Sequence, residues 1–238
     1  MSINPRVFIG YDKNEIVAFH TAAASVWRHC PSAQVIPCSP ESMGISRSRD
    51  PRQSTDFAFC RFAVPHYCNY EGWAVFMDAD MILRADIREL FALADEECSV
   101  MVVKHDYESA TETKFLNQAN VPYRCKNWSS VMLFNNALCR RLSKHYVNTA
   151  TGLELHQFKW TTDGRIGSLD PTWNHLVGEY EPNPDAKLVH WTLGGPYFDE
   201  YKGCEHSDEW RDLLDEMNSC AQRTKPVISH LVDAAKRQ

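Results

Sequence analysis

An apolar stretch interrupted by two carboxylates constrains this chain more than any other feature. In AVFMDADMIL, residues 74–83, Asp78 and Asp80 lie two residues apart between runs that read as buried strand. Dehydrating an ionised carboxylate is costly unless a cation or several hydrogen-bond donors compensate. The two aspartates are therefore either turn or cap residues satisfied by the backbone, or ligands of a metal ion.

The surrounding pattern predicts an α/β fold. Short apolar runs indicate strands at residues 6–10, 35–38, 73–78, 98–104, 129–135 and 187–191. Between them, helical periodicity predicts helices at 15–29, at 56–66 with a stop near Pro65, and around Trp210 near the C-terminus. Alternating strands and helices favour a mostly parallel sheet covered on both faces. In such sheets ligands collect at the carboxyl ends of strands, where Asp78 and Asp80 are expected.

Local signals refine this outline. Asp86, followed three residues later by Glu89, predicts a capping box for a helix at 87–95. In the first helix, Ile16, Phe19, Ala23 and Trp27 recur on one face, which we expect to be buried. Residues 42–53 are polar and without a period, which predicts a loop. The polar connection at 104–127 is longer than packing requires, as in lids and binding loops.

Composition excludes several classes of protein. The chain has 238 residues, of which 44% are hydrophobic and 24% charged, and a net charge of −6. The negative charge argues against a nucleic-acid binder. No apolar run approaches the roughly 18–20 residues that span a bilayer, and the N-terminus lacks the pattern of a signal peptide. Nine cysteines without a CxxC motif indicate reduced thiols. We therefore expect a cytoplasmic protein, with peripheral membrane association left open.

The paired aspartates suit a hard divalent cation. Residues two apart share a face of an extended chain, so both carboxylates of Asp78 and Asp80 can converge on one ion. Oxygen ligands favour Mg²⁺ or Mn²⁺, which keep coordination positions for water and substrate phosphates. A diphosphate group would complete such a site.

Six segments in a fixed order carry a family resemblance. They are Asn14, FCRFAVP (59–65), FMDADMIL (76–83), KNWSSVMLFNN (126–136), SLDPTWN (168–174) and VHWTLGGPYF (189–198). Together they resemble the GT-A glycosyltransferases, specifically the family-8-like retaining enzymes and related capsular-polysaccharide transferases. The resemblance spans residues 6–198. It implies a GT-A, Rossmann-like, mostly parallel mixed sheet flanked by helices, with a catalytic domain at 1–198 and a helical C-terminal extension at 199–238.

The resemblance also implies roles for individual residues. Asp78, Asp80 and His190 match the metal ligands of the family, and Arg61 matches an arginine that meets the phosphate or sugar of the donor. The residues expected to bind the nucleotide-sugar donor are Gly10, Tyr11, Asp12, Asn14, Arg61, Asp78, Ala79, Asp80, Asn127, Ser129, Gly194 and Gly195. Simpler readings stay open: Asn14 as a helix cap, Gly194 and Gly195 as a turn before Pro196, and His190 as a structural histidine.

The chain departs from the family at two places. Where the family has Asn-x-Gly before the strand at 131–135, this chain has Trp128-Ser129-Ser130, with Asn127 one place early. The acidic donor-site segment has no clean counterpart, and GLELHQFKW (152–160) offers His156 and Gln157 for the sugar pocket. The expected catalytic residues are Arg61, His156 and Gln157. At the end of the strand at 98–104, His105, Asp106 and Tyr107 are expected near the acceptor.

These inferences predict a metal-dependent glycosyltransferase. It would transfer a sugar from a nucleotide-sugar donor, expected to be UDP-linked, to a saccharide or other hydroxyl acceptor. The resemblance implies retention of configuration and a setting in surface polysaccharide or glycoconjugate synthesis. A nucleotidyltransferase that makes nucleotide sugars is the alternative, but the segment after the first strand, GYDKNE, is not rich in glycine. A phosphatase would have its DxD after the first strand. A non-catalytic binding protein of the same fold is the third alternative.

Overall fold

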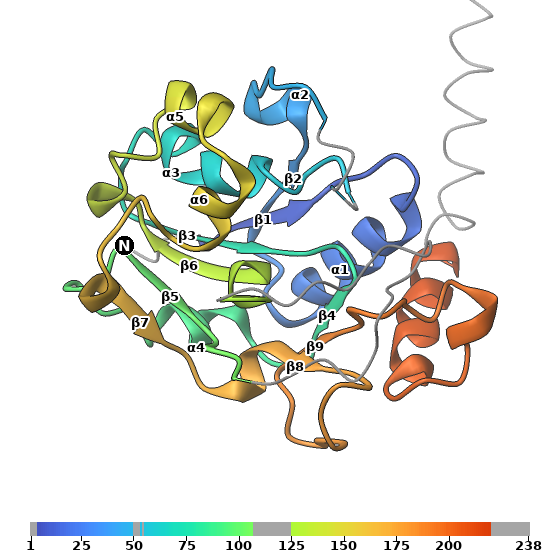
Figure 1. Ribbon diagram of the computed structural model, residues 1–238. Helices are drawn as coiled ribbons and strands as arrows, with labels where there is room; N and C mark the ends of the chain where they lie inside the picture. Colours follow the sequence, from blue (N-terminus) through green and yellow to red (C-terminus); the bar gives the residue numbers. More distant parts are fainter. Residues whose placement is uncertain (1–3, 50–52, 54, 107–124, 220–238) are drawn as a thin grey trace, which may run out of the picture.

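The computed structural model describes residues 4–49, 53, 55–106 and 125–219, and its centre is a six-stranded sheet (Figure 1). The strand order is β2 (Gln34–Cys38), β1 (Arg6–Gly10), β3 (Trp73–Met77), β6 (Val131–Asn135), β5 (Val100–Val102), β7 (Ile166–Ser168). β6 runs antiparallel to both of its neighbours, and the other neighbouring pairs are parallel. The sheet is therefore mostly parallel, as the sequence predicted. β3 and β6 are almost completely buried, which agrees with their continuous apolar runs.

A second, three-stranded sheet lies beside the first. It contains β4 (Met81–Leu83), β9 (Leu188–His190) and β8 (His175–Leu176) in that order. β9 is central, so His190 is opposite Met81 on one side and Leu176 on the other. β3 and β4 are separated by residues 78–80 alone, so the chain passes from the large sheet to the small sheet through the two aspartates.

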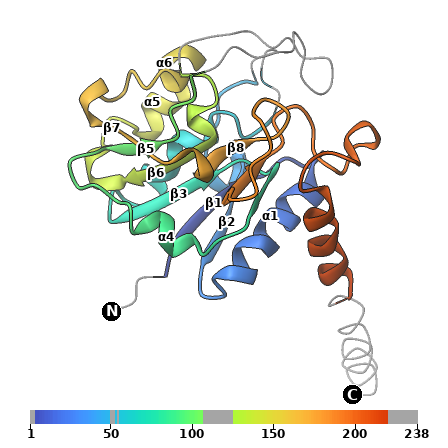
Figure 2. The ribbon, with the colours of Figure 1, turned by 90° about the horizontal axis from the view of Figure 1, so that it is seen from below.

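Helices cover both faces of the large sheet. α1 (Ile16–His29) and α4 (Ile87–Phe91) lie on one side, and α2 (Pro40–Met43), α3 (Val64–Tyr67), α5 (Lys144–Thr149) and α6 (Gly152–His156) on the other (Figures 1 and 2). α1 buries Ala18, Phe19, Ala22, Ala23 and Val26. Ile16 and Trp27, which were expected on the buried face, are 42% and 46% exposed. The prediction for these two residues was wrong because the buried face is centred on Ala22 and includes the polar Thr21 and Ser25, which turns Ile16 and Trp27 away from the core.

Short 3₁₀ helices fill much of the remaining chain. They are Cys60–Ala63, Trp128–Ser130, Asn136–Leu138, Asp163–Arg165, Pro171–Asn174 and Asp199–Tyr201. The predicted single helix at 56–66 was wrong: turns lead into the 3₁₀ helix Cys60–Ala63, and α3 then begins at Val64. Pro65 occupies the first turn of α3, where its missing N–H costs nothing. It therefore helps to start a helix and does not end one.

Two other local predictions need correction. Asp86 caps α4 by accepting the backbone N–H of Arg88, as expected for a cap. The predicted return bond of Glu89 is replaced by an ion pair with Lys187, 2.7 Å away, which connects α4 to the start of β9. The loop predicted at 42–53 begins with the last residues of α2, and most of the long connection at 104–127 lies outside the described residues.

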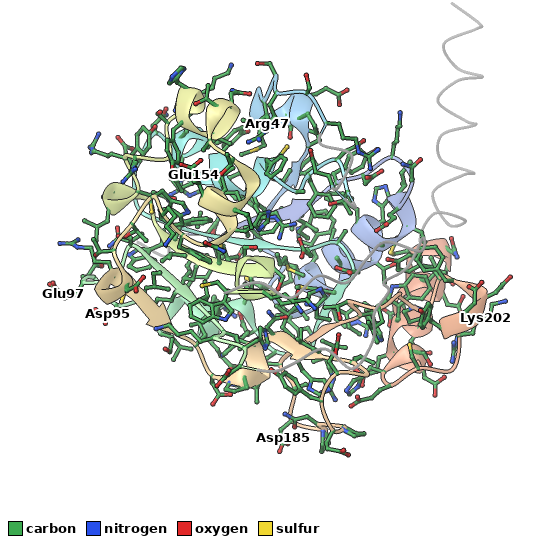
Figure 3. All side chains as sticks on the ribbon, in the orientation of Figure 1. Arg47, Asp95, Glu97, Glu154, Asp185 and Lys202 are labelled. Atoms are coloured by element: carbon green, nitrogen blue, oxygen red, sulfur yellow. The ribbon has the colours of Figure 1, made fainter. Side chains whose placement is uncertain are left out.

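The C-terminal segment packs on the small sheet. Residues 207–219 form a helix beside α1, and Arg28 of α1 pairs with Glu216 at 2.6 Å (Figure 2). Trp210 and Leu213 join a second apolar core made with Ile82, Val177, Ala186, Val189 and Trp191. Figure 3 shows Asp185 at the tip of the loop between β8 and β9, and Lys202 on the outer side of the C-terminal segment. The domain boundary proposed at residue 198 falls just before the 3₁₀ helix Asp199–Tyr201 and stays a prediction.

Two sequence-level expectations about the chemical environment can be compared with the structure. Cys30, Cys38, Cys60, Cys68, Cys98, Cys139 and Cys204 are free thiols, and Cys220 lies outside the described residues. Burial raises the pKa of the Cys60 thiol to about 12, so this thiol is unreactive at neutral pH. Among the described residues, none of the helices has the length and apolar character needed to cross a bilayer.

Candidate active site

The backbone at residues 78–80 is anchored to both sheets. The N–H of Asp78 donates to the carbonyl of Ser130 at 3.1 Å, next to β6 of the large sheet. The carbonyl of Asp80 accepts the N–H of Trp191 at 3.0 Å, just after β9 of the small sheet. The main-chain groups of the motif are thus used in holding it, and the two carboxylates remain for other partners.

Arg61 forms a buried pair with Asp78. Its Nη2 lies 2.8 Å from Oδ1 of Asp78, and the exposed fractions of the two side chains are 8% and 14%. Its Nη1 donates to Oδ2 of Asp78 at 3.3 Å and to the carbonyl of Ser129 at 2.9 Å. The guanidinium also lies 4.7 Å from the centre of the Phe76 ring. Arg61 is therefore buried and held by its neighbours, unlike a solvated surface arginine.

Burial controls the charge of Asp78. Desolvation raises the pKa of Asp78 to about 6, Arg61 opposes this rise, and the nearby Asp80 adds to it. The carboxylates of Asp78 and Asp80 therefore repel one another in a poorly hydrated place. Such a pair favours a bound cation, because a cation removes both penalties.

His190 faces Asp80 with a defined ring nitrogen. Nε2 of His190 lies 3.4 Å from Oδ1 of Asp80, and Nδ1 lies 2.9 Å from Oδ1 of Asn174. Nδ2 of Asn174 donates to Oγ of Ser130 at 2.9 Å and lies 2.9 Å from Nε2 of His105. The amide oxygen of Asn174 thus accepts a hydrogen bond from the N–H at Nδ1 of His190. This leaves the lone pair of His190 on Nε2, directed at the aspartates.

A chain of hydrogen bonds continues behind His190. Nδ1 of His105 lies 3.0 Å from the hydroxyl of Tyr180, whose ring stacks on the imidazole. Burial, together with a smaller contribution from the neighbouring His190, lowers the pKa of His105 to about 3. His105 is therefore neutral, and its Nε2 can accept from Asn174. The expected position of His105 near the glycosyl acceptor stays a prediction. Asp106 is exposed, and Tyr107 lies outside the described residues.

Asp78, Asp80 and His190 fit a divalent metal ion. One ligand atom of each residue lies within 4.8 Å of the ligand atoms of the others. Two carboxylates and one neutral imidazole are a donor set that Mn²⁺ accepts, and Mg²⁺ accepts the carboxylates. Each carboxylate oxygen has two lone pairs, so Asp78 can pair with Arg61 and still bind a cation.

A third carboxylate near the cluster was missed by the sequence reasoning. Glu15, before α1, is buried, and burial together with the charges of Asp80, Asp12 and Asp78 raises the pKa of Glu15 to about 8. The hydroxyl of Tyr197 donates to Oε2 of Glu15 at 3.5 Å. The only signal in the sequence was a carboxylate a few residues beyond the first strand, which is too common to single out.

The last residue of β1 and the residues that follow it are held by close packing and hydrogen bonds. Asp12 is buried, and its two carboxylate oxygens accept the backbone N–H groups of Asn14 and Asp56, each at 2.9 Å. Asn14 is exposed and does not cap α1, whose N-cap residue is Glu15 without a side-chain bond. The helix-cap reading of Asn14 was therefore wrong. Gly10 faces the Phe57 ring, where a Cβ atom would lie 2.4 Å from a ring carbon. The ring of Tyr11 packs edge-on against Phe19 at 5.3 Å.

The two glycines after β9 are required by aromatic packing. Gly194 has φ of +144°, and a Cβ atom there would lie 2.3 Å from the Tyr201 ring. A Cβ atom on Gly195 would lie 2.3 Å from the ring of Tyr197, the tyrosine that bonds Glu15. Their expected contact with phosphate oxygens stays a prediction, and the close ring contacts explain the glycines without it.

The segment from 127 to 157 connects to Arg61. Oγ of Ser129 lies 2.8 Å from Nδ1 of His156, whose ring is edge-on to Phe62 at 5.1 Å. Gln157 follows as the C-terminal cap residue of α6 and is half-buried. Asn127 has φ of +62°, and its carbonyl accepts from Oγ of Ser130 at 2.5 Å. The structure thus links His156 to Asp78 through Ser129 and Arg61, and it places Gln157 one residue farther on.

Comparisons with known proteins find a curated relative and solved structures with a similar fold. "Protein CDI" of Arabidopsis thaliana is 38% identical over 225 residues, which are 90% of this chain and 87% of that protein. Among solved structures, the bifunctional glycosyltransferase WbbM has a TM-score of 0.67 at 14% identity, over 90% of this chain and 50% of that chain. The galactosyltransferase LgtC, in complex with donor and acceptor sugar analogues, has a TM-score of 0.61 at 12% identity, over 89% of this chain and 95% of that chain.

A family model matches most of the chain. The model of glycosyl transferase family 8 matches residues 2–194, a range that includes Asp78, Asp80 and His190. The mixed sheet is the GT-A architecture of the structures just named. This chain is therefore a glycosyltransferase of the GT-A fold and belongs to glycosyl transferase family 8.

Proposed function

We propose that this enzyme moves a sugar from a UDP-linked donor to a hydroxyl acceptor, with retention of configuration, and that Asp78, Asp80 and His190 hold the divalent metal ion it needs. The observation that carries the proposal is the convergence of these three side chains. His190 is more than 100 residues from the aspartates in sequence, yet its Nε2 lies 3.4 Å from Asp80. The direction of that lone pair, fixed by Asn174, supports ligation over a structural role.

The residues around the cluster suit the departure of a nucleoside diphosphate. A bound Mn²⁺ or Mg²⁺ would supply Lewis-acid stabilisation of the charge that develops on the leaving group. Arg61 adds a fixed positive charge beside Asp78, held by three contacts, so little reorganisation is needed when negative charge grows nearby. His156, oriented by Ser129, and Gln157 are proposed to line the sugar side.

Other observations support the finer points. The complex of LgtC with donor and acceptor sugar analogues supports a sugar acceptor here, and another structure of LgtC carries a glutamine-to-glutamate substitution in its active site. The latter makes Gln157 worth testing. Retention is supported by the resemblance to family-8-like retaining enzymes. The buried free thiols agree with a reducing compartment such as the cytoplasm.

A direct test is the release of nucleoside diphosphate from a panel of nucleotide sugars, with and without Mn²⁺. We expect turnover of a UDP-sugar that requires the metal and disappears in EDTA. Asp80→Asn should keep the fold and lose this turnover, because the amide keeps the volume and removes the charge. Turnover that survives in EDTA would remove the metal from the mechanism, and turnover of another nucleotide alone would correct the donor.

His190 can be tested by binding without turnover. His190→Ala should weaken Mn²⁺-dependent binding of UDP about ten-fold or more, the equivalent of about 1.4 kcal/mol. The loss should be partial because the aspartates still hold the metal. Calorimetric titration of UDP at saturating Mn²⁺ measures it. Equal affinities of the variant and the wild type would show that His190 is not a ligand.

A further inference from the structure

A second group of potential metal ligands lies away from the aspartates. His175 of β8 and the adjacent Glu205 and His206 of the C-terminal segment bring together two imidazoles and a carboxylate. Nε2 of His175 lies 3.2 Å from Oε2 of Glu205, and Nε2 of His206 lies 3.1 Å from Oε1 of Glu205. The exposed fractions of the three side chains, in the order His175, Glu205 and His206, are 4%, 22% and 9%.

The tautomer of His206 points to a cation. Nδ1 of His206 lies 3.0 Å from Oε1 of Glu209, so it donates to that carboxylate. Glu209 is itself held by Nε of Arg84 at 2.8 Å. In the neutral ring, the lone pair is then on Nε2, which is buried and makes no hydrogen bond of good geometry within the described residues. A lone pair 3.1 Å from a carboxylate oxygen is repulsive unless a proton or a metal ion lies between them.

The spacing of the three ligand atoms fits a metal ion. Nε2 of His206, 3.1 Å from Oε1 of Glu205, lacks hydrogen-bond geometry, whereas Nε2 of His175 is within hydrogen-bonding distance of Oε2 of Glu205, at 3.2 Å. In a tetrahedral zinc site with bonds of about 2.0–2.1 Å, neighbouring ligand atoms are about 3.3 Å apart. The arrangement Glu209–His206 also repeats the carboxylate–histidine pairing that orients zinc-binding imidazoles in general.

The polar groups around Glu205 fix its carboxylate as well. The backbone N–H of Asn183 donates to Oε1 of Glu205 at 3.1 Å, and Nε1 of Trp191 donates to its carbonyl at 3.0 Å. The cluster therefore has ligands from two parts of the chain, and the side chains of Glu205 and His206 are each oriented by a further contact. Two imidazoles select against Mg²⁺ and Ca²⁺ and favour a borderline ion such as Zn²⁺.

We propose that His175, Glu205 and His206, with a water molecule as the fourth ligand, bind a zinc ion that fastens the C-terminal segment to the small sheet. His175 directly follows Asn174, which orients His190, and β8 pairs with β9, which carries His190. A zinc ion there would stabilise the frame of the candidate active site without contacting the donor. The proposal rests on none of the donor or acceptor assignments above.

The test uses the full chain with the other cluster disabled. In Asp78→Asn/Asp80→Asn protein, stripped with a chelator, zinc is titrated in competition with a chromogenic chelator. We expect one zinc ion per chain at micromolar or lower free zinc, and a rise in melting temperature when zinc is restored. If this protein binds no zinc tighter than about 10 µM, the range in which adventitious surface histidines bind, the proposal is wrong.

A matched pair of histidine variants in the same background locates the ion. His206→Gln should weaken zinc binding at least ten-fold, whereas His145→Gln, at an exposed histidine of α5, should leave it unchanged. Near-ultraviolet circular dichroism checks folding, and Glu205→Gln replaces His206→Gln if the latter does not fold. Substitution with Co²⁺ should give the visible absorption of a four-coordinate ion. Equal zinc affinity in the His206 and His145 variants would place the ion elsewhere and overturn the proposal.

Discussion

Asn174 shows how much of the candidate active site depends on one buried, uncharged side chain. Its oxygen fixes the tautomer of His190, while its nitrogen bonds Ser130 and His105. The sequence motif SLDPTWN contained Asn174, but the motif gave no reason to choose it. Its role depends on the pairing of β8 with β9, which brings Asn174 next to His190 in the fold and which the local sequence does not reveal.

Asn174→Leu should weaken Mn²⁺-dependent UDP binding by about 10–100-fold, the usual range for losing the hydrogen bond behind a metal-bound histidine. The control is Asn136→Leu, at another buried asparagine, whose Nδ2 donates to the carbonyl of Glu71. The control should lose stability and keep its UDP affinity in the folded fraction. Calorimetry of both variants measures the difference, and an Asn174 variant that binds like the control would contradict the tautomer argument.

Glu15 predicts a dependence of stability on pH in metal-free protein. Its pKa in the folded state is about 8, above the ordinary value of 4.5, so the folded state binds the proton more tightly than the unfolded state. The free energy of unfolding should therefore fall as pH rises from about 4.5 to about 8. Asp78, whose pKa is also raised by burial, acts in the same direction.

Glu15→Gln should remove part of this slope. The variant should match the wild type near pH 5 and exceed its free energy of unfolding at pH 8 by about 1–3 kcal/mol, because the amide avoids ionisation next to Asp80, Asp12 and Asp78. Urea denaturation in EDTA at the two pH values measures it. The assignment would be refuted if the free energy of unfolding of the wild type rose between pH 5 and pH 8 and that of the variant changed by the same amount.

Among the elements, strands with continuous apolar runs were predictable, including the three-residue strands β5 and β9 inside the predicted ranges 98–104 and 187–191, whereas most other short elements were not. β1, β3 and β6 agree with the predicted ranges to within about two residues, because burial on both faces leaves an unbroken apolar pattern. The edge strand β2 also agrees, although only Cys38 in it is buried. β7 and β8 contain three and two residues, and α5 and α6 contain six and five, too few to show a period. The pieces of 56–67 were misread as one helix because the apolar spacing there serves turns and a 3₁₀ helix.

The residues of the candidate active site also differ in how far the local sequence predicts them. Asp78 and Asp80 were predictable because they interrupt a strand locally. His190 needed the family resemblance, since nothing in its own neighbourhood distinguishes a ligand from a core histidine. Glu15 had no signature specific enough to single it out, and His105 was singled out only by its position at the end of a strand. Their contacts in the structure arise from carboxylates and amides that the two sheets bring together.

Arg84, just after β4, is a test of how the C-terminal segment is attached. Its Nε donates to Glu209, and its Nη1 donates to the carbonyls of Pro184 and Ala186 at 2.9 and 2.6 Å. Arg84→Met should increase hydrogen exchange in residues 199–219 and cost about 1–3 kcal/mol of stability. Arg165→Met, at an exposed arginine of the 3₁₀ helix Asp163–Arg165, is the control and should change exchange in residues 199–219 little. Equal exchange in both variants would show that Arg84 does not hold the segment.

For the whole molecule, the second apolar core determines whether the C-terminal helix unfolds together with the rest of the chain. Trp210 is 4% exposed, and its ring lies 5.7 Å from that of Tyr197, which contacts Glu15. Trp210→Ala should cost about 3–5 kcal/mol, because a buried indole leaves a cavity. Trp27→Ala, at a 46% exposed tryptophan, should cost much less. Urea denaturation compares them, and similar losses would mean that the C-terminal helix contributes little to the fold.

The passage of the chain from one sheet to the other through residues 78–80 makes a bound ion a cross-link between two cores. β3, which leads into Asp78, packs in the larger core, whereas Val189 and Trp191, on either side of His190, pack in the smaller one. An ion held by these residues ties together groups whose positions depend on different sets of apolar contacts. Conservative substitutions in either core, far from the donor, should therefore register as altered metal affinity. Pairs of such substitutions, one from each core, should show epistasis that disappears when the metal is removed.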